Sequence, residues 1–221
     1  MGRNKILAQH EHYHLFTRGV RKQDIFHDDR DYVRFIFLLL HFQGSYVPTN
    51  ISKSVSRYLT TKTFGKSIEI VDKILRDPLV RLECFTLMPN HIHICVEQIA
   101  ESGVSKYMQR VLAAYAKYYN EKYQYTGHLF QSKFGRVLVE DNDQLLYLSA
   151  YIHKNQRELK GWKNIEHLYP WSSLSDCVKD NRWGELFQPS IFLGQFDSGD
   201  HYLDFVRKST AKTPEAVGLD L

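Results

Sequence analysis

The chain has 221 residues, enough for one well-filled domain but too few for two large ones. Hydrophobic residues make up 43% and aromatic residues 14%, a composition that excludes a disordered chain. Lysine and arginine number 29 against 25 acidic residues, and the net charge of +4 permits nucleic-acid binding without predicting it, because a local patch matters more than the sum.

The three cysteines, Cys84, Cys95 and Cys177, are far apart and form no CxxC pair. This excludes a zinc ribbon and predicts a reducing compartment with no disulfide framework. The first residues lack an apolar stretch of signal-peptide length, and the longest apolar run, residues 35–40, is far too short to span a bilayer. We therefore expect a soluble, cytoplasmic protein.

The spacing of apolar residues predicts the secondary structure. Alternation predicts strands and helical spacing predicts helices. Asp28 and Asp29 can cap one helix, and Asp141 or Asn142 can cap another. In chain order we expect a strand over 12–17, a helix over 29–40, mainly loop with at most a short helix over 44–65, a helix over 68–75, strands over 80–88 and 92–96, a long helix after Gly103, a strand over 134–139 and a helix over 142–158.

This order of elements indicates an α+β fold. A strand–helix–strand–strand–helix–strand–helix chain suits a split βαβ sandwich, in which an antiparallel sheet carries helices on one face. We expect one domain over residues 1–175. Residues 176–221 are expected to form a C-terminal extension that packs on the domain or trails from it.

The strongest local signal is the motif His91-Ile92-His93. Alternate side chains of a strand share a face, so the two imidazoles should point the same way while Ile92 points into the core. Two imidazoles held side by side can coordinate one divalent cation. Taken alone the motif is weak evidence, because pairs of strand histidines also occur without a metal.

A third ligand and a nucleophile are available on the helix over 142–158. Tyr151 and Asn155 are four residues apart and should share one face of this helix. Asn155 offers a carbonyl oxygen suited to Mg²⁺ or Mn²⁺, and Tyr151 offers a phenol that could attack a phosphorus atom. A tyrosine packed between helix and sheet is the plain structural alternative. His153 should point to a different side of the helix.

A rival metal cluster is formed in the sequence by His10, His12 and His14, which also alternate. We favour the interpretation that these are exposed strand residues near the terminus. His14 would nevertheless lie beside the active site if the first strand were the neighbour of the strand that carries His91.

Basic residues near these segments are candidates for nucleic-acid binding. Such side chains hold phosphates and set register and affinity without reading bases. The candidates are Arg18, Lys133, Arg136 and Lys154.

Five segments together resemble the HUH single-tyrosine transposases of small insertion sequences, and in particular the REP-associated tyrosine transposases. They span residues 12 to about 175 and occur in the order seen in that family. The segments are YHLFTRGVRKQDIFHDDRDYVRF, TLMPNHIHICVE, SKYMQRVLAAYAKYYNEKY, GHLFQSKFGRVLVEDNDQLLYLSAYIHKN and YPWSSL.

The resemblance implies a ferredoxin-like sandwich and a role for each candidate. His91 and His93 match the metal-binding pair, Tyr151 matches the nucleophile and Asn155 occupies the place of the third ligand, with Mg²⁺ or Mn²⁺ as the cofactor. The implied activity is that of a single-strand DNA endonuclease and strand-transferase acting on hairpin-bearing ends through a 5′-phosphotyrosine intermediate. One departure is Gln156, which stands where the family often has proline and lets the helix run on.

Several alternatives stay open at this point. The protein could be a metal-dependent phosphodiesterase that uses water, in which Tyr151 is dispensable, or a non-catalytic module that binds DNA hairpins. Both a homodimer, with a site completed in trans, and a monomer are compatible with the sequence.

Overall fold

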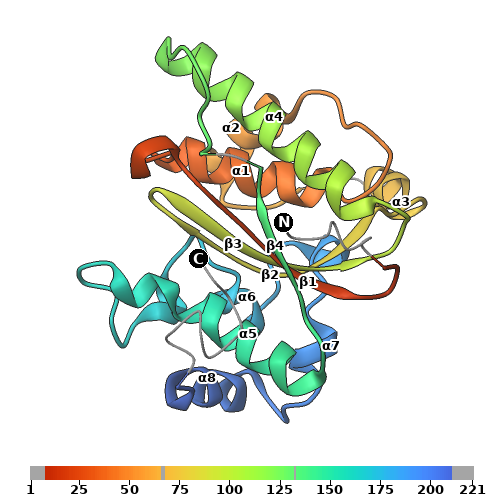
Figure 1. Ribbon diagram of the computed structural model, residues 1–221, viewed down its shortest axis with the longest axis vertical. Coiled ribbons are helices and arrows are strands. Elements are labelled where there is room, and N and C mark those ends of the chain that lie inside the picture. Colours follow the sequence, from red (N-terminus) through yellow and green to blue (C-terminus); the bar gives the residue numbers. More distant parts are fainter. Residues whose placement is uncertain (1–7, 66–67, 132, 211–221) are drawn as a thin grey trace, which may run out of the picture.

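The computed structural model describes residues 8–65, 68–131 and 133–210, and its centre is a four-stranded antiparallel sheet (Figure 1). The order across the sheet is β2-β3-β1-β4, so β3 lies between β1 and β2, as in a split βαβ sandwich. The predicted α+β class is confirmed. The strands are β1 (His12–Arg18), β2 (Val80–Met88), β3 (His91–Gln98) and β4 (Gly135–Leu138).

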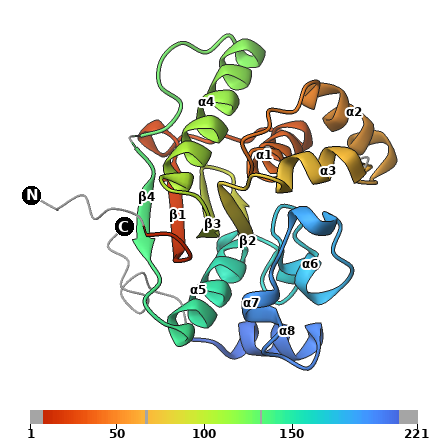
Figure 2. The ribbon, with the colours of Figure 1, turned by 90° about the vertical axis from the view of Figure 1, so that its right-hand side faces the viewer.

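Helices cover both faces of the sheet rather than one, which corrects the expectation from the sequence (Figure 2). Helices α1 (Asp29–His41) and α4 (Gly103–Tyr123) lie on one face, and α5 (Asn142–Lys154) packs against β2 and β3 from the other. The physical reason is visible in β2, where all residues but Arg81 are buried. Such a continuous buried run is typical of a strand covered on both faces.

The region between α1 and β2 contains two helices. Helix α2 (Ile51–Thr61) replaces most of the loop expected over 44–65, whereas α3 (Ile68–Leu75) agrees with the prediction. The serine- and threonine-rich composition belongs to the exposed face of α2. Its buried residues Ile51, Val55 and Tyr58 follow helical spacing, so α2 is amphipathic and packs on α1.

The C-terminal part packs against α5 and along the edge strand β2, and its Gly184–Leu186 turn contacts α3. Both α8 and α7 contact α5, and α6 contacts α8. The division at residue 175 stays a prediction, and residues 211–221 of the predicted extension lie outside the described residues. The helices of this part are α6 (Leu174–Val178), α7 (Ser190–Leu193) and α8 (Gly199–Lys208). Short 3-10 turns lie at Val20–Lys22, Asn155–Glu158, Glu166–Leu168 and, between α6 and α7, Gly184–Leu186.

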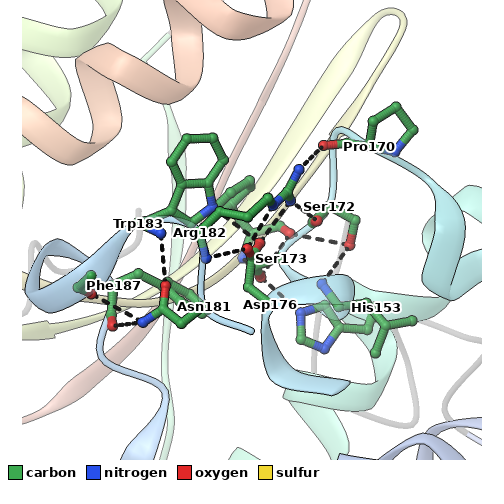
Figure 3. Close-up of polar contacts among 12 residues, drawn as sticks. His153, Pro170, Ser172, Ser173, Asp176, Asn181, Arg182, Trp183 and Phe187 are labelled. Carbon is green, nitrogen blue, oxygen red and sulfur yellow. Dashed lines mark hydrogen bonds and ion pairs between the residues drawn. The ribbon is translucent and has the colours of Figure 1, made fainter. Parts of the chain in front are cut away.

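A buried polar network anchors this part (Figure 3). The Asp176 carboxylate accepts hydrogen bonds from the Arg182 guanidinium (2.7 and 2.8 Å) and from the Trp183 indole (3.0 Å). Ser173 Oγ accepts from the Phe85 backbone N–H of β2 (2.9 Å) and is hydrogen-bonded to His153 of α5 (2.9 Å). The network therefore connects the C-terminal segment to the sheet and to α5.

The three cysteines are free and buried, as expected for small apolar side chains. Across the described residues, none of the helices has the length and apolar character required to cross a membrane.

Candidate active site

Two histidines of β3 face helix α5. His91 and His93 are two residues apart, and their ring centroids lie 5.1 Å apart with the ring planes nearly perpendicular. His93 is buried and His91 is half-buried, so the pair opens toward solvent on the side of His91. Strand alternation alone produces this arrangement, as the sequence predicted.

Tyr151 of α5 lies directly beside this pair. Its ring meets the His93 ring edge-on, with centroids 5.4 Å apart, and its side chain is only 8% exposed. Asn155 is the first residue after α5, and its amide nitrogen donates to the Tyr151 backbone carbonyl (2.8 Å). Its side chain is also within hydrogen-bonding reach of the His91 ring and of the Tyr151 hydroxyl. The structure thus brings all four predicted residues together.

The donor set fits a hard or borderline divalent cation. Because the amide nitrogen of Asn155 is occupied by a backbone carbonyl, its amide oxygen is the atom left to act as a ligand. Two imidazoles and one amide oxygen form a nitrogen- and oxygen-based set that is compatible with a divalent cation.

Burial controls the protonation of the site. Burial, together with the charge of Arg18, lowers the pKa of His91 to about 4. Burial, with the neighbouring His14, His91 and Arg18, lowers the pKa of His93 well below its usual range. Both rings are therefore neutral near pH 7, which is the form that binds a cation. Burial and the charge of Glu158 raise the pKa of Tyr151, partly offset by Asn155 and Arg18, so the phenol keeps its proton until the site assists it.

The family follows from the sequence match. Residues 43–155, just over half of the chain, match the family of IS200-like transposases, and this stretch includes the histidine pair, Tyr151 and Asn155. The chain belongs to the IS200-like transposase family. No curated protein matches the sequence.

A solved structure agrees with the transposase fold. The structure of a REP-associated tyrosine transposase bound to a REP hairpin has a TM-score of 0.51 and 10% sequence identity to this chain. The match covers 85% of this chain and 90% of the other. At this identity the match shows the fold, and together with the family it confirms the predicted resemblance to HUH single-tyrosine transposases.

His14 also lies beside the candidate site. It is 1% exposed, and its Nε2 is hydrogen-bonded to Nδ1 of His93 (2.9 Å). The interpretation of His14 as an exposed strand residue is therefore wrong. The conditional expectation that it would lie beside the site is confirmed, because β1 pairs directly with β3.

The rival cluster of three histidines does not converge. His10 is exposed and pairs with Glu97, whereas His12 pairs with Glu83 (2.9 Å). Among the residues that the structure describes, no three His, Cys, Asp or Glu side chains form a group that could hold a metal ion. His10, which precedes β1, and His12 and His14 of β1 thus make three separate contacts.

The predicted basic residues divide into two groups. Arg18 ends β1 opposite His91 and is close enough to lower the pKa of both site histidines. Arg136 lies in the edge strand β4, and Lys133 is exposed just before it. Lys154 differs: it is 6% exposed and its ammonium donates to the Ser209 carbonyl after α8, so it is not presented to an incoming strand.

Two cations beside the site were not predicted. Arg21 and Lys22 are exposed and both have positive φ (54° and 63°), in a turn that follows β1. The turn is attached to the β2–β3 hairpin, because the Asn90 side chain donates to the Lys22 carbonyl (3.0 Å) and Gly19 N–H donates to Asn90 (2.9 Å). The left-handed conformation is unfavourable for such residues and concentrates at functional sites. The sequence signal is the basic pair directly after the Arg-Gly turn.

Proposed function

We propose that this member of the transposase family is a single-strand DNA endonuclease and strand-transferase with Tyr151 as its covalent nucleophile. The observation that carries the proposal is the position of the Tyr151 ring, from a helix near the end of the domain, against His93 of the central strand. A tyrosine packed at random on a sheet has no reason to meet two neutral imidazoles and an amide at the same point.

The cofactor is Mg²⁺ or Mn²⁺, held by His91, His93 and Asn155. When bound, the cation polarises the scissile phosphate and offsets the negative charge of the transition state.

The chain's own residues carry the transfer. The Tyr151 oxygen attacks phosphorus, and the bond from phosphorus to the 3′-oxygen breaks. The phenol loses its proton and the departing 3′-oxygen gains one, so the leaving strand ends in a 3′-hydroxyl. The 5′-phosphate stays on Tyr151, and attack by another 3′-hydroxyl reverses the step and joins two strands. Asn155 and Arg18 favour the charged phenolate, against the effect of burial.

The substrate is single-stranded DNA with hairpin structure, bound beside β1, β3 and β4. Arg18, Arg21 and Lys22 lie next to the turn of the β2–β3 hairpin. Arg136 lies in the edge strand β4, and Lys133 lies just before it. These residues are suited to hold phosphates rather than to read bases. Since all four site residues come from one chain, we propose a site completed in cis, which a monomer can carry.

The test is incubation with hairpin-bearing single strands and Mn²⁺. The wild-type protein should form a denaturation-resistant protein–DNA adduct, and Tyr151→Phe should form none while retaining hairpin binding. The matched control is Tyr147→Phe, since Tyr147 lies one turn earlier on α5 and is 45% exposed.

Each alternative predicts a different result. If Tyr151→Phe keeps most of the cleavage, the enzyme is a water-using phosphodiesterase and the covalent mechanism is wrong. If neither protein cleaves any strand that it binds, the protein is a hairpin-binding module.

A further inference from the structure

The contact between His14 and His93 is an in-plane hydrogen bond. In the pairing of β1 with β3, His14 faces Cys95 and His93 faces Phe16, so the two histidines are diagonal neighbours on one sheet face. The nitrogen atoms are 2.9 Å apart, whereas the ring centroids are 5.1 Å apart with only 14° between the planes. The two ring planes are nearly parallel, and the centroids are much farther apart than the bonded nitrogens. The rings therefore meet edge to edge rather than face to face.

Only one proton can occupy this bond. Both rings are buried, and a neutral imidazole carries a single N–H. If His93 donates from Nδ1, its Nε2 keeps a lone pair and can bind a cation. If His14 donates, Nε2 of His93 carries the proton and cannot be a ligand. The direction of this bond therefore decides whether His93 is competent.

His14 has no evident purpose in stability. Its Nδ1 is buried without a hydrogen-bond partner in the described part of the chain, whereas its Nε2 is hydrogen-bonded to His93. A buried polar atom without a partner lowers the stability of the fold, so an apolar residue would suit the core better. The same ring meets Tyr151 edge-on at 5.9 Å, which places His14 against both the ligand and the nucleophile.

We propose that His14 is a positioning residue that accepts the His93 Nδ1 proton and so presents His93 Nε2 to the metal ion. The inference rests on the proposed function, because it assumes that His93 is a ligand. A ligand histidine is generally oriented by such an acceptor on its other nitrogen, and loss of the acceptor weakens metal binding about 10–100-fold.

The experiment measures Mn²⁺ affinity of the purified full-length protein by calorimetry without DNA, alongside thermal unfolding in the absence of metal. His14→Leu should bind Mn²⁺ about 10–100-fold more weakly while its Tm is equal to or above that of the wild type. His14→Gln, whose amide oxygen can accept from His93, should recover most of the affinity. The matched control is His12→Gln, on the same strand and face but paired with Glu83 rather than His93, which should bind as the wild type does.

A purely structural role predicts the opposite pattern. In that case His14→Leu has a lowered Tm and an unchanged Mn²⁺ affinity, which overturns the inference. Nitrogen NMR of the Mg²⁺-loaded wild type gives a second reading that does not depend on a variant. A proton on Nδ1 of His93 supports the proposal, and a proton on Nε2 overturns it.

The failure of this inference can be told from failure of the proposed function. The His91→Ala variant should lose the Mn²⁺ binding that the wild-type protein shows. If wild type and His91→Ala bind alike, both proposals fail. If His91→Ala loses binding but His14→Leu does not, only the role of His14 fails.

Discussion

Acidification should destabilise this fold through its buried histidines. Burial lowers the pKa of His14 and of His153 to about 3, and burial with the charge of Arg18 lowers that of His91 to about 4. In the unfolded chain each histidine takes a proton near its ordinary pKa of about 6.5. Between these values the unfolded state binds more protons, so the free energy of unfolding falls as the pH falls below about 6.5.

The magnitude follows from linkage. Lowering the pH from about 7.5 to about 5.5 removes about 1.4 kcal/mol for each such histidine, or about 4 kcal/mol for the three together. His12 opposes this effect. Burial alone would lower its pKa, but Glu83, Glu97 and Glu11 together outweigh burial and raise it, so the contribution of His12 to the free energy of unfolding grows as the pH falls. Since domains are stable by about 5–15 kcal/mol, the loss is large.

His153 offers a clean test of one contribution. It is fully buried between the Tyr202 hydroxyl (2.6 Å) and Ser173 Oγ (2.9 Å), and Figure 3 shows it beside Ser173. His153→Gln keeps a polar group there but removes the titration. The loss of stability between the two pH values, measured by urea unfolding, should be smaller than in wild type by about 1.4 kcal/mol.

The control is His201→Gln, because His201 is largely exposed on α8. If wild type and His153→Gln lose the same stability on acidification, His153 takes up a proton equally in both states. The account of its burial would then be wrong.

Three further predictions concern the fold and the site. Trp183→Ala should cost about 3–5 kcal/mol in denaturant unfolding, because the indole is 1% exposed among aromatic side chains; a loss below about 1 kcal/mol would contradict this packing. Gly103→Ala should cost about 1–3 kcal/mol by the same assay, since an added Cβ would lie 2.0 Å from the Leu79 carbonyl oxygen, and an unchanged midpoint would refute the close approach. Arg18→Gln should shift the pH profile of adduct formation upward, because Arg18 lowers the pKa of Tyr151; an unshifted profile would exclude this electrostatic role.

Several features were predictable because they depend on local spacing. The alternation of β3 puts His91 and His93 on one face, and the four-residue interval brings Asn155 back to the Tyr151 carbonyl. The caps at Asp28 and Asp141 formed as expected, each accepting from a backbone N–H in the first turn. Such relations need only the period of a strand or helix.

Other features could not be read from spacing. From its position in the sequence Lys154 was expected to be a surface cation near Tyr151. In the structure its ammonium donates to the carbonyl of Ser209, the residue after α8. In the sequence His14 resembles the exposed His10 and the partly exposed His12, and the pairing of β1 with β3 places it among buried residues. The composition of 44–65 indicated loop because α2 exposes its polar face.

The amino-acid sequence by itself determined the four strands, the helices α1, α3, α4 and α5, the shared face of the histidine pair and the likeness to single-tyrosine transposases. Only the tertiary structure decided that helices cover both sheet faces, that Tyr151 reaches His93 and that His14 completes the contact. The physical reason is range: spacing along the chain sets which side chains share a face, whereas packing between distant segments sets which faces meet.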